Sequence, residues 1–130
     1  MQVLIDYNLE GDADLLFAPL LKDGWVELLK IEFVYFVDRS LDPKSDDTTI
    51  WRFAQAQGMI LLTYNRNKKE DTSLTATIER ENTPSSLPVL TIANQSRLKE
   101  FNYRQETATK LAEVIMYIEN YLGTGRLYIP

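Results

Sequence analysis

The sequence of 130 residues contains no cysteine and no histidine. Without cysteine the chain has no disulfide, no thiolate metal ligand and no thiol nucleophile, which fits a reducing compartment. Without histidine, a Ser-His-Asp triad, an imidazole zinc site and general-base catalysis by imidazole are all excluded. Any catalysis by this chain therefore depends on carboxylates, lysine, tyrosine, hydroxyl groups or a hard metal ion held by oxygen ligands.

Long hydrophobic runs are also missing. No apolar run approaches the roughly 20 residues that cross a bilayer, and the start of the chain reaches a charge at Asp6 without the basic region of a signal peptide. We therefore expect a cytoplasmic protein without a membrane partner. The length and the hydrophobic share of 45% are those of one globular domain, which we expect to span residues 1–130.

Positive charge is scarce, since the formal net charge is −5. Sequence-independent binding of nucleic acid depends on lysine and arginine that neutralise phosphates, so the composition weighs against it. A metal ion among clustered acids would still admit a phosphodiester locally. The basic residues Arg66, Lys68 and Lys69 could meet phosphates there, although a solvated loop face explains them more simply.

Short apolar runs alternate with longer segments of helical spacing, which favours a parallel sheet covered by helices on both faces. The predicted fold is a three-layer α/β/α sandwich with four or five mostly parallel strands, in which residues 3–5 and 60–62 are central neighbours. We expect strands at 3–5, 31–37, 59–63 and 89–92 with a closing edge strand at 126–129, and helices from 12 or 14 to Gly24, about 50–57 before Gly58, at 71–81, and along the apolar stripe 111–122 before Gly123.

Ligands of open α/β sheets bind beyond the carboxyl ends of the strands, where the strand order reverses. This rule directs attention to residues 6–8, 38, 63–67 and 93–95. Asp6 directly follows the first strand, where it either faces a ligand or binds the amides of a turn. Asp46 and Asp47 precede a helix; one of them suffices as an N-terminal cap, which leaves the other free to face a ligand.

Further oxygen-bearing side chains follow the strand at 59–63. Thr63 and Asn65 come directly after it, and Asp71 precedes a predicted helix. Without a ligand these residues are a polar loop with a helix cap. If they lie beside Asp6, three separated acids with water would suit Mg²⁺ or Mn²⁺, which take few carboxylates and keep several waters.

At this point the sequence resembles a known family. The segments Leu4-Ile5-Asp6-Tyr7-Asn8, Ser45-Asp46-Asp47 with Ile50, Ala54 and Gly58, and Ile60-Leu61-Leu62-Thr63 with Asn65 and Arg66 are similar to those of PIN-like domains, across residues 3–92. The closest similarity is to a short, uncharacterised bacterial branch related to the toxin nucleases of toxin–antitoxin pairs. The resemblance implies a ribonuclease that uses Mg²⁺ or Mn²⁺, with RNA as substrate and an antitoxin as partner.

Carried over by position, Asp6 is the first acid of the family and Asp47 is the second. The third block departs from the pattern, because Asn65 and Asn67 stand where acids are usual. An amide carries no charge and cannot act as a general base, so Asp71 would have to replace the missing carboxylate. The predicted catalytic residues are Asp6, Asp47 and Asp71, the predicted metal ligands are these three with Asn65, and the predicted substrate contacts are Asn8, Thr63, Asn65 and Arg66.

Three functions remain open on the sequence. The first is a metal-dependent ribonuclease (a hydrolase), weakened by the asparagines at acidic positions. The second is a catalytically inactive PIN-like binding or oligomerisation module. The third uses Asp6 as a phosphoryl-accepting nucleophile, although no second acid follows two residues later. We also expect a homodimer, because the aromatic segment Phe33–Phe36 and the tyrosines of the last helix exceed what a core of this size needs.

Overall fold

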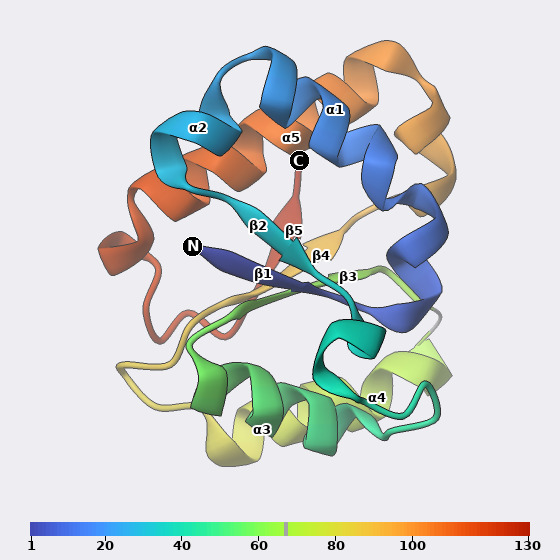
Figure 1. The fold of residues 1–130 in the computed structure, drawn as a ribbon. Coiled ribbons are helices and arrows are strands. Elements are labelled where there is room, and N and C mark those ends of the chain that lie inside the picture. The colour runs from blue at the N-terminus through green and yellow to red at the C-terminus, as the bar shows by residue number, and fades with distance from the viewer. Residues whose placement is uncertain (67) are drawn as a thin grey trace.

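The protein forms one five-stranded sheet, shown in Figure 1. This computed structural model describes the chain except for residue 67, and the side chains of residues 67–72 lie outside the described part. Every neighbouring pair of strands is parallel, in the order β2-β1-β3-β4-β5. The strands are β1 (Gln2–Ile5), β2 (Glu32–Val34), β3 (Ile60–Tyr64), β4 (Val89–Ile92) and β5 (Arg126–Ile129).

Helices cover both faces of the sheet, which confirms the predicted three-layer α/β/α architecture (Figure 1). On one face lie α1 (Ala13–Lys22), α2 (Trp25–Leu29) and α5 (Phe101–Met116), and on the other lie α3 (Asp47–Gln57) and α4 (Lys68–Glu81). Short 3₁₀ helices add η1 (Tyr7–Asp12), η2 (Phe36–Arg39), η3 (Gln95–Lys99) and η4 (Ile118–Asn120). Within the described residues, no helix has the length and apolar character required to span a bilayer.

The two central strands are β1 and β3, as predicted, with Val3 opposite Ile60 and Ile5 opposite Leu62. Their side chains alternate between two fully covered faces, which explains why the sequence shows continuous apolar runs instead of alternation. Val3 and Ile5 pack in the cluster under α1 and α5, whereas Leu4 packs in the cluster under α3 and α4. By the same alternation, the next residue, Asp6, belongs to the α3 and α4 face.

One crossover differs in hand from the others. The chain steps from β1 to β2 and from β4 to β5 in opposite directions, yet α1 and α5 lie on the same face. Parallel crossovers are almost always right-handed, so the β4–α5–β5 connection is the left-handed one. Contacts of η3 explain this path, because Leu98 is buried in the cluster of α1 and Gln95 donates a hydrogen bond to Asp12 at 2.9 Å.

Several predicted boundaries were wrong. The second strand ends at Val34 instead of residue 37, because Asp38 accepts a hydrogen bond from the amide of Tyr35 at 2.9 Å and the chain turns into η2. Within Phe33–Phe36 both phenylalanines are buried and Tyr35 is partly buried, so this segment is not the exposed surplus on which the predicted homodimer partly rested. The dimer itself stays a prediction.

The helices differ from the predicted ones mainly at their ends. The sequence analysis assigned no helix to Trp25–Leu29, and α4 begins at Lys68, before the predicted start at Asp71. The last helix ends at Met116, well before Gly123, because the chain tightens into η4, where Ile118 still packs against the core. The apolar stripe therefore continues past the end of the α-helix, which is why it suggested a longer one.

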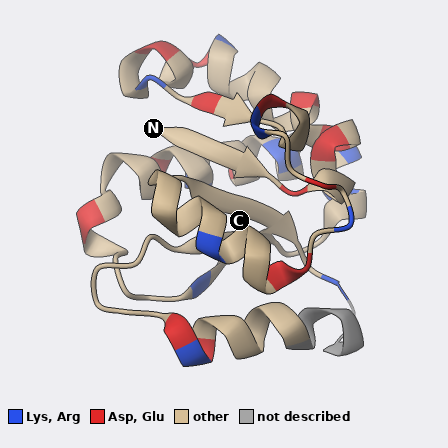
Figure 2. Cartoon of the chain, turned by 60° about the horizontal axis from the view of Figure 1, so that its bottom comes forward, with Lys and Arg blue, Asp and Glu red and all other residues tan. Residues whose placement is uncertain are grey.

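Charges of both signs are distributed over the surface. In the view of Figure 2, lysines and arginines lie scattered among acidic residues instead of lining one face. In this view, the described residues of the acidic chain therefore show no continuous stripe of basic residues.

Candidate functional site

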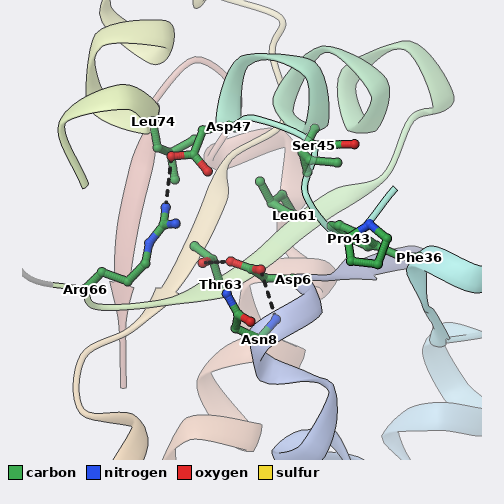
Figure 3. Close-up of a pocket in the computed structure, with 11 residues that line it drawn as sticks. Asp6, Asn8, Phe36, Pro43, Ser45, Asp47, Leu61, Thr63, Arg66 and Leu74 are labelled. Atoms are coloured by element: carbon green, nitrogen blue, oxygen red, sulfur yellow. Dashed lines mark hydrogen bonds and ion pairs between the residues drawn. The ribbon is translucent and has the colours of Figure 1, made fainter. Parts of the chain in front are cut away.

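A small polar cavity lies at the carboxyl ends of β1 and β3. Its volume is about 70 Å³. The strand order reverses at this place, because β2 lies on one side of β1 and β3 lies on the other. Figure 3 shows its walls, which come from the sheet, the loop before α3, the first turn of α3 and the segment after β3. We call it the polar cavity; its lining includes Asp6, Asn8, Phe36, Pro43, Ser45, Asp47, Ile50, Leu61, Thr63, Arg66 and Leu74.

Asp6 is held in place by both of its carboxylate oxygens. The hydroxyl of Thr63 donates to Oδ2 at 2.6 Å, and the backbone amide of Asn8 donates to Oδ1 at 3.3 Å (Figure 3). Thr63 is only 1% exposed, so its position is fixed by the packing of β3. Both sequence interpretations of Asp6 therefore apply: it binds a turn amide at the start of η1, and it also faces the polar cavity.

The two acids at the start of α3 divide their roles as the sequence predicted. Asp46 is the N-terminal cap, and its Oδ1 accepts a hydrogen bond from the amide of Thr49 at 2.8 Å. This hydrogen bond lowers the pKa of Asp46. Because the cap is already provided, Asp47 in the first turn lines the polar cavity instead.

Arg66 brings a positive charge into the polar cavity. Its guanidinium lies 3.2 Å from Oδ2 of Asp47, and both side chains are largely buried (Figure 3). A partly buried pair of this kind interacts more strongly than a surface pair, because less water screens it. Asp47 therefore has a cationic partner within the polar cavity.

The structure brings together most of the predicted site residues. Asp6, Asn8, Asp47, Thr63 and Arg66 all line the polar cavity, as predicted for contacts of a ligand. The sequence analysis missed Phe36, Pro43 and Ser45, which also line it. Phe36 was assigned to the predicted strand 31–37 but lies in η2, whereas Pro43 and Ser45 lie in the loop before α3, where no sequence signal placed them at the cavity.

Two predicted metal ligands are not among the described residues that line the polar cavity. The side chain of Asn65 is exposed and does not line the polar cavity. Asp71 lies in the first turns of α4, but its side chain is outside the described residues, as are those of Asn67, Lys68 and Lys69. Among the side chains that the structure describes, no group of three or more acids is close enough to hold a metal ion.

The donor set of the polar cavity suits a hard divalent ion. It offers the carboxylates of Asp6 and Asp47, the hydroxyl of Thr63 and the amide oxygen of Asn8, and Mg²⁺ in proteins is often bound by one or two carboxylates together with waters and phosphates. A volume of about 70 Å³ holds roughly two water molecules at about 30 Å³ each. The cavity therefore has room for an ion with its waters, whereas a nucleotide would have to lie outside it.

Comparison of the chain with protein-family models, with curated proteins and with solved structures found no match. The assignment of a function therefore depends on the geometry of the polar cavity and on its chemistry.

Proposed function

We propose that this protein is a ribonuclease of the PIN-like type that requires Mg²⁺ or Mn²⁺. The observation that carries the proposal is that carboxylates from separate elements, Asp6 after β1 and Asp47 in α3, line one small polar cavity at the point where the strand order reverses. Asp6 and Asp47 would hold the ion. A bound ion of this kind polarises a phosphodiester and lowers the pKa of a bound water.

The residues around these acids have separate tasks. Thr63 fixes the carboxylate of Asp6 through its 2.6 Å hydrogen bond, so the charge of Asp6 points in one direction before any ligand arrives. Arg66 neutralises Asp47 in the absence of an ion, at 3.2 Å. If Asp47 held a metal ion, the guanidinium of Arg66 would become available to a phosphate, for which arginine has matching geometry. Asn8, on the other side of Asp6, can donate or accept through its amide.

An activity assay tests the proposal. Purified protein should cleave single-stranded RNA with Mn²⁺ present, and both EDTA and the variant Asp6→Asn should abolish cleavage. Asp23→Asn is the matched control, because Asp23 is an exposed aspartate at the end of α1 that does not line the polar cavity. Cleavage that continues in EDTA or in Asp6→Asn would come from another site or from a contaminant and would refute the proposal.

A second function is favoured by the pair of Arg66 and Asp47. Arg66 already pairs with Asp47, one of the two acids of the cavity. Asn65 carries no negative charge that could replace the one balanced by Arg66. In this case the fold serves as a binding or oligomerisation module without catalysis. Calorimetry with Mn²⁺ distinguishes the two functions, since the module binds no ion, whereas the ribonuclease binds one that Asp6→Asn removes.

Protein partners belong to the same proposal. If the resemblance to toxin nucleases holds, an antitoxin would cover the polar cavity, and the protein would form a homodimer. The exposed aromatic residue Tyr117, 54% exposed after α5, still supports a partner surface. A monomeric mass in light scattering at tens of micromolar protein would exclude the homodimer.

A further inference from the structure

A second hollow lies next to the polar cavity and has a different character. Its volume is about 500 Å³, within the range of about 300–1,000 Å³ that is usual for organic ligands. Tyr7, Phe36 and Val37 supply its apolar lining, and Glu10, Ser40 and Asp42 supply polar groups. We call it the aromatic hollow.

The aromatic hollow and the polar cavity share a wall. Phe36 and Pro43 line both of them, and Figure 3 shows these two side chains at the edge of the polar cavity. Tyr7 directly follows Asp6 in the chain. A ligand that places a phosphate at Asp6 therefore has its neighbouring group close to the aromatic hollow.

The apolar lining is suited to a flat ring. The ring of Tyr7 packs against that of Phe36, with centroids 6.0 Å apart, and Phe36 is 3% exposed. Tyr7 thus packs against a buried ring while 44% of it remains exposed, and Val37 in the same lining is 80% exposed. Supported and exposed aromatic rings of this kind are the platforms on which unpaired bases stack.

The polar lining selects what kind of ring can bind. Among the described residues that line the hollow there is no lysine or arginine, while two carboxylates are present. Carboxylates repel a phosphate and accept hydrogen bonds from amino groups. Adenine, cytosine and guanine carry an exocyclic amino group, whereas uracil carries none.

We propose that the aromatic hollow is a subsite for an unpaired nucleobase with an exocyclic amino group, stacked on Tyr7 beside a phosphodiester at Asp6. The inference rests on the proposed ribonuclease function and gives it a substrate class: single-stranded RNA with adenine, cytosine or guanine next to the cleaved bond. Glu10 and Asp42 accept from the amino group, and Tyr7 provides the stacking surface.

Titration with nucleosides tests the subsite apart from the metal. Adenosine, cytidine and uridine have no phosphate, so their binding to ¹⁵N-labelled protein, followed by amide chemical shifts without metal, does not depend on the polar cavity. We expect saturable shifts around Tyr7 and Val37 with adenosine and cytidine, and at least several-fold weaker binding of uridine. Equal affinity for all three nucleosides, or shifts that lie elsewhere on the protein, would overturn the inference.

Variants assign the roles. Tyr7→Ala should weaken adenosine binding by about tenfold or more, the amount expected for loss of base stacking. Tyr128→Ala is the control, because Tyr128 is similarly exposed, at 51%, but lies on the edge strand β5. Glu10→Gln should reduce the preference for adenosine over uridine, since it removes the charge that favours the amino group. A preference unchanged in Glu10→Gln and Asp42→Asn would refute recognition of the amino group.

The two proposals fail in different ways. Asp6→Asn should lose Mn²⁺ binding and keep nucleoside binding, because Asp6 does not line the aromatic hollow. Wild-type protein that binds nucleosides at Tyr7 but no Mn²⁺ would support the subsite and refute the ribonuclease. Protein that binds Mn²⁺ through Asp6 but no nucleoside would refute the subsite alone.

Discussion

The sharpest test of the polar cavity is the stabilisation of the fold by Mn²⁺. A ligand that binds only the folded state adds RT ln(1 + [L]/Kd) to the free energy of unfolding, which is about 1.4 kcal/mol at ten times Kd. For a chain of 130 residues, the usual entropy of unfolding of about 2.1 cal/mol/K per residue converts 1 kcal/mol into about 3.7 °C. Wild-type protein should therefore gain about 5 °C in Tm at ten times Kd.

In Asp6→Asn the gain should fall below about 1 °C at the same Mn²⁺ concentration. The asparagine oxygen can still accept the hydrogen bond of Thr63, so the fold is kept while the charge is lost. The remaining carboxylate, Asp47, is already paired with Arg66 at 3.2 Å. Thermal unfolding followed by circular dichroism, at constant ionic strength, measures both shifts. Equal gains in wild type and Asp6→Asn would refute the assignment of the ion to this cavity.

Arg66→Gln should change the gain in Tm with Mn²⁺ in the opposite direction to Asp6→Asn. Loss of the guanidinium leaves Asp47 without its ion pair, so the apo protein should become less stable and the gain with Mn²⁺ should become larger than in wild type. If the gain with Mn²⁺ instead becomes smaller, Arg66 does not compete with the ion, and the proposed exchange of partners at Asp47 is wrong.

Three further predictions concern stability. Thr63→Val should lower the free energy of unfolding, measured by urea unfolding, by about 1.5–3 kcal/mol, the usual contribution of a hydrogen bond to a charged group, here the 2.6 Å bond to Asp6. The hydrogen bond that Asp46 accepts at the start of α3 lowers its pKa in the folded state. This carboxylate therefore stabilises the fold fully above the unfolded pKa of 3.8, and the stabilisation is lost as the pH falls through the folded pKa. Asp46→Ala should flatten this part of the dependence of Tm on pH. Gly123→Ala should cost about 1–3 kcal/mol, because φ is 79° and a Cβ would lie 3.0 Å from backbone atoms of Pro84; an unchanged Tm would contradict this.

The sequence predicted the centre of the fold well, for a physical reason. Strands that are buried on both faces have continuous apolar runs, so β1, β3 and β4 were found within about a residue of their ends. At the start of α3 the expected single cap was confirmed in Asp46, because a helix start needs only one side-chain acceptor at the cap, and Asp47 lines the polar cavity.

Features that depend on tertiary contacts were not predictable from the sequence. Phe33–Phe36 has the composition of a strand, and only the hydrogen bond from the amide of Tyr35 to Asp38 shows that the chain turns there. Because η2 was missed, the aromatic hollow was missed with it, since most of its wall comes from η2 and the loop that follows. The left-handed crossover through α5 likewise depends on the burial of Leu98, which no local pattern reveals.

The ion pair between Arg66 and Asp47 determines what the polar cavity can bind. Asp6, which follows β1, and Asp47, in α3, both line a cavity of about 70 Å³, and carboxylates that come close together repel each other. Arg66 pairs with Asp47 at 3.2 Å, so the negative charge of Asp47 is already balanced before any ion binds. An ion that binds through the same oxygen of Asp47 would have to displace the guanidinium, and this would weaken the binding of the ion. The displaced guanidinium would offset part of this lost binding energy only when a phosphate is present to accept its hydrogen bonds. If the protein is the proposed ribonuclease, we therefore expect the ion and the phosphodiester to bind together more tightly than either one alone.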